Sequence, residues 1–251
     1  MINLNESDLR NYKLLNTNSL NTDSNIYLTD DEYLYKIFTD KVIFYEEKIK
    51  TLLFLVNKKI DNAILPDDLI VIDNQISGYK MKYLKGYDSL KKGVDEITSL
   101  NNKLKIIKKL YIALKELHQL GLYLGDIHLD NILYQDDKAY LIDFDQSRFI
   151  DINFRNHPYY FLKIRENEPM IIKENYYTDN LKTMICCLSI LLNENLEELI
   201  IDNNLLDIID ELQMDSYLKK QIIDVINSND NVIYFDDALD KYENKIRQRI
   251  L

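Results

Sequence analysis

The sequence predicts an α+β fold in two lobes: a small antiparallel sheet with one helix in residues 1–84, then a larger, mostly helical lobe in residues 85–251. Short segments rich in β-branched and aromatic residues, separated by Asn, Asp, Thr and Ser, fill most of the first part. Apolar residues at helical spacing dominate the second part. Between the two parts, Leu84-Lys85-Gly86 breaks the strand pattern, so we expect the first lobe to end there.

The first lobe is expected to combine short strands with a single helix. The strands are predicted at residues 12–15, 25–29, 33–38, 69–73 and 78–83. A helix is predicted from Asp40 onwards, because apolar residues recur there at spacings of three and four. Its predicted inward face consists of Ile43, Glu46, Ile49, Leu53 and Val56. Glu46 is therefore an acidic residue within an otherwise apolar stripe.

The second lobe begins with a long amphipathic helix over residues 104–117, and Gly121 is its predicted stop. Two short β segments, at residues 132–134 and 139–142, flank an Asp-Asp turn. Thr178-Asp179 is a predicted N-cap for an apolar helix over residues 181–192. Helices separated by Asn and Asp turns are expected in the remainder of the chain.

Composition narrows the class of protein. The 251 residues include 31 Lys and Arg and 42 Asp and Glu, so the formal net charge is −11. This negative charge disfavours nucleic acid, with its anionic phosphate backbone, as the main partner. The only cysteines, Cys186 and Cys187, are adjacent, which excludes a disulfide framework and favours a reduced compartment. No secretory signal or bilayer-length apolar run is visible. We therefore expect a soluble cytoplasmic protein without a nucleic-acid or membrane partner.

Two neighbouring motifs carry the functional signal. The first is Leu124-Gly125-Asp126-Ile127-His128-Leu129-Asp130-Asn131, and the second is Asp143-Phe144-Asp145. The separation of Asp126 from Asn131 matches H-R-D-L-x-x-x-N, and Asp143-Phe144 matches the start of D-F-G. With the order of strands and helices along nearly the whole chain, these motifs resemble the protein kinase-like superfamily. The resemblance implies a two-lobed kinase-like fold and transfer of phosphate from ATP with Mg²⁺.

The chemistry of these residues agrees with that resemblance. Phosphoryl transfer needs cations on the phosphates, side chains that hold the cations, and an oriented acceptor. Mg²⁺ prefers oxygen ligands, so Asn131 and Asp143 are candidate metal ligands. Asp126 is the candidate base that accepts the proton of the attacking hydroxyl. An Asx turn or a helix cap explains each residue singly, whereas the spaced set favours a catalytic site.

The resemblance also implies a cation on the third strand. Lys36 takes the position of the family's strand lysine, which contacts the phosphates of ATP. A lone strand lysine is usually solvated, but Glu46 on the inward helix face is a suitable partner for it. Glu47 is the alternative partner. It is less favoured because Lys50 and Thr51 follow it at helical spacing.

Two further positions follow from the resemblance. Met81-Lys82-Tyr83-Leu84 resembles the segment that links the lobes and binds adenine through its backbone. Lys82 would supply a carbonyl, Leu84 a carbonyl and an N–H, and Met81 the back of the pocket; an ordinary strand end explains the segment equally well. Asp179 falls where the family has an aspartate that anchors the catalytic loop, although a helix cap explains it too.

The chain departs from the family pattern at four places. The glycine-rich loop is replaced by residues 16–24, which contain no glycine. Leu124-Gly125 replaces the His-Arg pair, and the arginine that senses activation-loop phosphorylation is absent with it. His128 stands where protein kinases usually have lysine and is more similar to the aminoglycoside and choline phosphotransferase branch. Asp145 stands in place of the glycine of D-F-G. Its carboxylate is expected to join the metal site, to cap the next turn, or to be a solvated turn residue.

Three functions remain open at this stage. The expected function is an ATP- and Mg²⁺-dependent Ser/Thr protein kinase. A small-molecule kinase is the alternative, supported by Gly125 and His128; its mark would be an acidic acceptor pocket, with Asp130, Asp145 and the acidic C-terminal helices as candidates. A pseudokinase scaffold is supported by the missing glycines and opposed by the complete set of metal and base residues.

Overall fold

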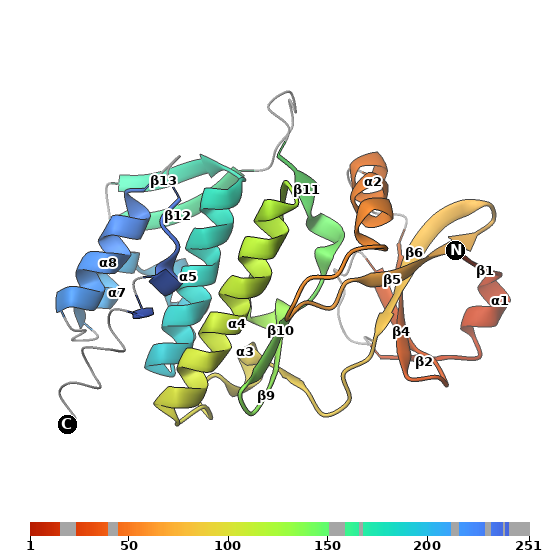
Figure 1. The fold of residues 1–251 in the computed structure, drawn as a ribbon, viewed down its shortest axis with the longest axis horizontal. Helices are drawn as coiled ribbons and strands as arrows, with labels where there is room; N and C mark the ends of the chain where they lie inside the picture. The colour runs from red at the N-terminus through yellow and green to blue at the C-terminus, as the bar shows by residue number, and fades with distance from the viewer. Residues whose placement is uncertain are drawn as a thin grey trace.

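The computed structural model describes residues 1–15, 24–39, 45–150, 159–165, 168–211, 216–228, 232–237 and 239–240. Within these ranges the chain is an α+β protein that combines a mixed six-stranded sheet with helices and small two- and three-stranded sheets. Figure 1 shows the large sheet with α1 and α2 on one side of the molecule and helices α4 to α8 on the other. The predicted α+β class is confirmed at this level.

All strands of the large sheet lie within residues 2–82. Their order is β1-β5-β6-β4-β3-β2, and β1 pairs in parallel with β5 while the other pairs are antiparallel. The strands are β1 (Ile2–Leu4), β2 (Lys13–Leu14), β3 (Ser24–Leu28), β4 (Tyr33–Phe38), β5 (Pro66–Ile72) and β6 (Gln75–Lys82). Each predicted strand of this region overlaps an observed one. Strand β1 and the short helix α1 (Glu6–Leu9) were not among the predicted elements.

The two faces of the sheet carry different clusters. On one face, Tyr35 and Ile37 pack with Leu9 of α1. Side chains alternate along a strand, so Lys36 points to the opposite face. There, Tyr79 packs with Leu52 of α2 (Tyr45–Leu55), and Lys36 is in register with Tyr79 across the β4–β6 pair. The alternation therefore turns Lys36 toward the side of the sheet that α2 covers.

Long helices form the centre of the other part. The helices are α3 (Leu90–Gly93), α4 (Leu100–Gln119), α5 (Tyr176–Leu192), α6 (Leu196–Asp202), α7 (Leu205–Glu211) and α8 (Ser216–Ile226). The predicted stop of α4 is confirmed, because Gly121 follows it with φ +80°, a conformation that favours glycine. The predicted N-cap of α5 is wrong. Asn175 caps this helix through its side chain, which accepts hydrogen bonds from the N–H groups of Tyr177 and Thr178.

Three small sheets complete the described part of the fold. They consist of β7 (Asp88–Ser89), β9 (Ile132–Gln135) and β10 (Lys138–Leu141), of β8 (Leu122–Tyr123) and β11 (Arg148–Phe149), and of the hairpin β12 (Tyr159–Arg165) and β13 (Glu168–Lys173). Figure 1 shows β9, β10 and β11 beside α4 on its sheet-facing side. Two 3₁₀ turns overlap the two sequence motifs: Leu129–Asn131 ends the first, and Phe144–Gln146 follows Asp143 in the second.

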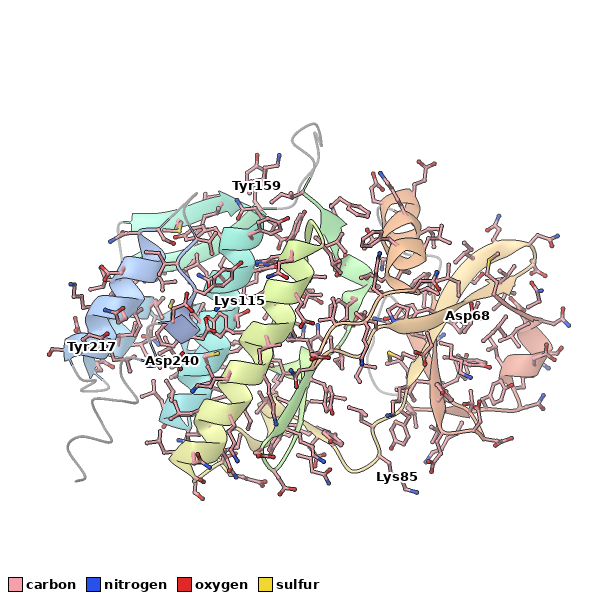
Figure 2. The ribbon with its side chains drawn as sticks, in the orientation of Figure 1. Asp68, Lys85, Lys115, Tyr159, Tyr217 and Asp240 are labelled. Carbon is pink, nitrogen blue, oxygen red and sulfur yellow. The ribbon has the colours of Figure 1, made fainter. Side chains whose placement is uncertain are left out.

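Residues 232–237, near the end of the described chain, pack against α4 through charged and polar contacts. Lys115, labelled in Figure 2, pairs with Asp236 at 2.8 Å and with Asp237 at 3.0 Å. One turn along, His118 Nδ1 lies 2.8 Å from the hydroxyl of Tyr234. These contacts bring residues 232–237 against the helix that supports the motif loop. In the described part of the chain, no helix combines the length and the apolar character needed to cross a bilayer.

Candidate active site

Four charged side chains, three of them buried and the fourth, Asp143, a quarter exposed, meet where β4, α2 and the Asp-Phe-Asp turn converge. The ammonium of Lys36 donates a short hydrogen bond to Oδ1 of Asp143 and lies 3.2 Å from Oδ2 of Asp145. The same oxygen of Asp145 accepts a hydrogen bond from Lys48 of α2 at 3.0 Å. Lys36, Lys48 and Asp145 are each less than a tenth exposed. Two cations and two carboxylates thus alternate in one chain, and their formal charges balance.

Burial and ion pairing act in opposite directions on these groups. Burial raises the pKa of Asp143 to about 6, against the attraction of Lys36. For Asp145, burial also acts to raise the pKa, but Lys36 and Lys48 outweigh it and lower the pKa. Burial acts to lower the pKa of Lys36, and the two carboxylates outweigh it and raise the pKa. Lys36 therefore stays charged, held by its partners.

The expected partner of Lys36 is wrong. Glu46 is exposed on α2, and the helix turns Lys48, Thr51, Leu52 and Leu55 inward instead. Leu53, which shared the predicted inward face with Glu46, is half exposed at 50%. The predicted stripe pointed the wrong way because four consecutive apolar residues end this helix and occupy every face. Ile43, on the same predicted stripe, lies outside the described residues.

Asp145 takes the place in the ion chain that the sequence analysis gave to Glu46. Its interpretation as a solvated turn residue is wrong, because the side chain is 3% exposed and touches two lysines. Asp143 adopts φ 64° and ψ 65°, a left-handed conformation uncommon for residues other than glycine. Backbone conformations of this kind cluster at functional sites. The hydroxyl of buried Tyr79 lies 3.5 Å from Oδ1 of Asp143 and completes the surroundings of this carboxylate.

The first motif forms a tight loop beside this cluster. The side-chain amide nitrogen of Asn131 lies 3.0 Å from the carbonyl oxygen of Asp126, 3.2 Å from its Oδ2 and 2.9 Å from Nε2 of His128. An amide nitrogen has two hydrogens, so it satisfies two of these acceptors at a time. Its amide oxygen remains an oxygen ligand for a cation. The backbone oxygen of Asn131 accepts from the N–H of Ile142, which fixes the loop beside Asp143.

Asp126 and His128 form a partly exposed pair. Oδ1 of Asp126 lies 3.6 Å from Nε2 of His128, and their side chains are 46% and 37% exposed. The Asp126 carboxylate raises the pKa of His128. Burial acts to raise the pKa of Asp126, but His128 outweighs burial and lowers it. Asp126 is therefore ionised at neutral pH, as a proton acceptor must be.

Buried polar contacts fix the backbone of the loop. The carboxylate of Asp179, which is inaccessible to solvent, accepts hydrogen bonds from the N–H groups of Leu124 and Gly125. The expected anchoring contact is therefore present. Nε2 of His118 lies 3.2 Å from the same carboxylate. Gly125 has φ +81°, and an added Cβ would come within 3.3 Å of the carbonyl oxygen of Gln146, which explains the glycine at this place in the motif.

Two further side chains hold the loop and were not found from the sequence. Lys182 of α5 donates a hydrogen bond to the carbonyl of Gly125 and pairs with Glu174 at 2.7 Å. Both carboxylate oxygens of Glu197 accept from the N–H of Leu129, at 2.9 and 3.1 Å. These contacts join residues that are distant in sequence, so no local pattern marks them.

The predicted adenine segment ends the large sheet. Met81 is buried in β6, Lys82 is exposed at the strand end, and Leu84 is half-buried. The carbonyl of Leu84 accepts a hydrogen bond from the N–H of Tyr87 at 3.3 Å, so a local turn already engages this group. Most of the glycine-free loop, residues 16–23, lies outside the described residues. The adenine contacts stay a prediction.

A cavity of about 470 Å³ opens beside Asp126. The motif loop, α5, α6 and the strand β12 form its walls. Besides Asp126, its charged or titratable residues are His128, Lys163, Lys182 and Glu197, its rings are Tyr160 and Phe161, and its aliphatic residues are Ile127, Ile185 and Ile200. A volume of this size is typical of sites for small molecules.

The site has oxygen atoms that could bind Mg²⁺. Among the described residues, no three or more His, Cys, Asp or Glu side chains gather closely enough to hold a metal by themselves. Mg²⁺ does not require such a cage, because it binds one or two carboxylates together with water and substrate phosphates. Asp143 and the amide oxygen of Asn131 fit this requirement. Asp145 is already engaged by two lysines.

Comparison with known proteins adds no family. No family model matches the chain, and no curated protein is similar enough to be matched. The chemistry of the site must therefore carry the functional inference.

Proposed function

We propose that this chain is an ATP- and Mg²⁺-dependent phosphotransferase that transfers the γ-phosphate to a hydroxyl group. In this proposal it has the two-lobed protein kinase-like fold, with an N-terminal lobe in residues 1–84 and a C-terminal lobe in residues 85–251. One observation carries the proposal: a buried strand lysine, Lys36, meets Asp143 beside the loop that contains Asp126 and Asn131. These side chains come from separate segments, and together they offer the charges that phosphoryl transfer needs.

Each side chain has a part in the proposed reaction. Lys36 would contact the phosphates of ATP, held in place by Asp145 and, through it, by Lys48. Asn131 and Asp143 would hold Mg²⁺, which supplies positive charge to the phosphate oxygens. Asp126 would orient the acceptor hydroxyl and accept its proton as the new P–O bond forms and the bond to ADP breaks.

Two acceptor classes remain within this proposal. The expected acceptor is a serine or threonine side chain of a protein, whereas Gly125 and His128 of the first motif support a small molecule. The cavity beside Asp126 favours a small molecule, because it is a bounded space of about 470 Å³. The adjacent unoxidised cysteines agree with a cytoplasmic location, and the acidic composition argues against a nucleic-acid partner.

A thermal shift measured with and without Mg²⁺ tests the nucleotide part of the proposal. ATP with Mg²⁺ should raise the thermal midpoint, because a ligand present at a hundred times its Kd stabilises the folded state by about 2.7 kcal/mol. Asp143→Asn should abolish most of the Mg²⁺-dependent part. Asp130→Asn is the matched control, since Asp130 is an aspartate of the first motif whose side chain pairs with Lys91 at the surface. No shift at millimolar ATP with Mg²⁺ would contradict the proposal.

A further inference from the structure

The cavity beside Asp126 carries information about the acceptor, provided that the proposed phosphotransferase function holds. Its lining is mixed: aliphatic side chains from the motif loop, α5 and α6, two aromatic rings on β12, and charged or titratable groups from all four elements. The state of each charged group therefore decides which acceptors fit.

The carboxylates of the cavity are already engaged. Glu197 accepts hydrogen bonds from the N–H of Leu129 and from the thiol of Cys186, and burial raises its pKa. Asp126 is the proposed base and is paired with His128. Neither carboxylate is left to bind a cationic acceptor without disturbing the loop. An amine-rich acceptor would therefore find no free acidic partner among the described lining residues.

Two of the acidic candidates, Asp130 and Asp145, lie outside the cavity, whereas the acidic C-terminal helices contribute Glu197 of α6 to its lining. Asp130 pairs with Lys91 at 3.2 Å on the surface, and Asp145 lies buried between Lys36 and Lys48. Neither residue lines the cavity. The expectation is therefore wrong for Asp130 and Asp145, and the one lining carboxylate that the C-terminal helices supply, Glu197, is already bound to Leu129 and Cys186. An aminoglycoside-like polycation loses most of its support.

The cations of the cavity differ in their engagement. Lys182 is held by the carbonyl of Gly125 and by Glu174, and its ammonium lies 4.7 Å from the centroid of the Tyr160 ring. Lys163 lies on β12, and its ammonium forms no ion pair or hydrogen bond with another described residue. Phe161 is the next residue after Tyr160 on β12. Its side chain is 59% exposed and offers an apolar surface at the cavity. A cation and two rings are thus the groups available to a ligand.

We propose that the cavity binds a small hydroxylated organic acid as the phosphate acceptor. Its acid group pairs with Lys163, its apolar or aromatic body lies against Tyr160 and Phe161, and its hydroxyl points to Asp126. In the reaction, the acceptor oxygen forms a bond to the γ-phosphorus, the bond between that phosphorus and ADP breaks, and the hydroxyl proton passes to the Asp126 carboxylate and then to solvent.

Three acceptors with the same phenylpropyl skeleton test this class. The acid is 3-phenyllactate, the neutral analogue is 3-phenylpropane-1,2-diol, and the cationic analogue is 2-amino-3-phenylpropan-1-ol. Release of ADP above the acceptor-free rate is measured for each, alongside kanamycin and a serine-containing peptide. The acid should give the highest kcat/KM. Lys163→Met should lower kcat/KM for the acid by about 10- to 100-fold, the value of a charge-assisted hydrogen bond, mainly through KM.

Controls separate the possible failures. Lys163→Met should leave kcat/KM for the diol within about twofold, and Lys138→Met, an exposed lysine on β10, should change neither acceptor. If ATP with Mg²⁺ neither binds nor turns over, the phosphotransferase proposal itself fails. If ATP binds but the amine, kanamycin or the peptide is preferred, or if no acceptor of the series stimulates ADP release, the acid proposal is overturned. An unchanged acid-to-diol ratio in Lys163→Met overturns it as well.

Discussion

Replacement of Lys48 by methionine tests the buried ion chain most sharply. Lys48 and Asp145 have side chains that are each 3% exposed and 3.0 Å apart. Removing the ammonium leaves two carboxylates opposite one remaining lysine, in a site with little access to water. Loss of one partner of a buried pair costs about 3–5 kcal/mol in the free energy of unfolding. For a chain of this size, that loss corresponds to a decrease of roughly 6–20 °C in Tm.

The double variant gives the decisive comparison. Lys48→Met combined with Asp145→Asn leaves Lys36 and Asp143 as a balanced pair. Its destabilisation should therefore be smaller than the sum of the two single losses by at least about 1 kcal/mol, within the range of coupling between residues in contact. Urea unfolding followed by circular dichroism measures all variants, with exposed Lys59→Met as the control, which should change stability by less than about 0.5 kcal/mol. Additive losses would refute the ion chain.

Three further outcomes follow from the site. Lys36→Ala should slow phosphate transfer by about a hundredfold or more. Glu46→Ala should leave the initial rate within about twofold, because Glu46 is exposed. An equal loss of rate in the two variants would restore Glu46 as the partner of Lys36. Asp179→Asn should lower the free energy of unfolding, measured by urea titration, by about 1–3 kcal/mol. An amide supplies only one of the two acceptor oxygens that bind the N–H groups of Leu124 and Gly125. Unchanged stability would contradict the anchoring role of Asp179. Cys186 and Cys187 are buried and their thiol pKa values are raised, so iodoacetamide at pH 8 should label them only as the chain unfolds; rapid labelling of the folded protein would argue against their burial.

Local patterns predicted the elements that local forces determine. The strand at residues 33–38 was placed with the bounds of β4, because a run rich in aromatic and aliphatic residues lies there between polar turn residues. The long amphipathic stripe and Gly121 likewise located most of α4 and its stop. Asp126 and Asn131 lie together as expected, since five residues of sequence already hold them in one loop.

Contacts between distant segments decided the rest. Lys48 is buried because it reaches Asp145, 97 residues away, and no periodicity within α2 contains that information. The same applies to Glu197, which binds the motif loop across 68 residues. Strand β1 is three residues long and depends on parallel pairing with β5, so its own sequence gives too little signal.

Asp126→Asn tests the proposed chemistry most directly. The substitution preserves the shape of the side chain and removes its basic oxygen, while Lys36, Asn131 and Asp143 remain to hold nucleotide and metal. The Kd for ATP with Mg²⁺ and the single-turnover rate of γ-phosphate transfer are measured on the same preparations. The proposed mechanism predicts a Kd within about threefold of the parent and a transfer rate lower by about a hundredfold to ten-thousandfold. Transfer at the parental rate would contradict the assignment of Asp126 as the base, and lost ATP binding in a folded variant would make it a metal ligand instead.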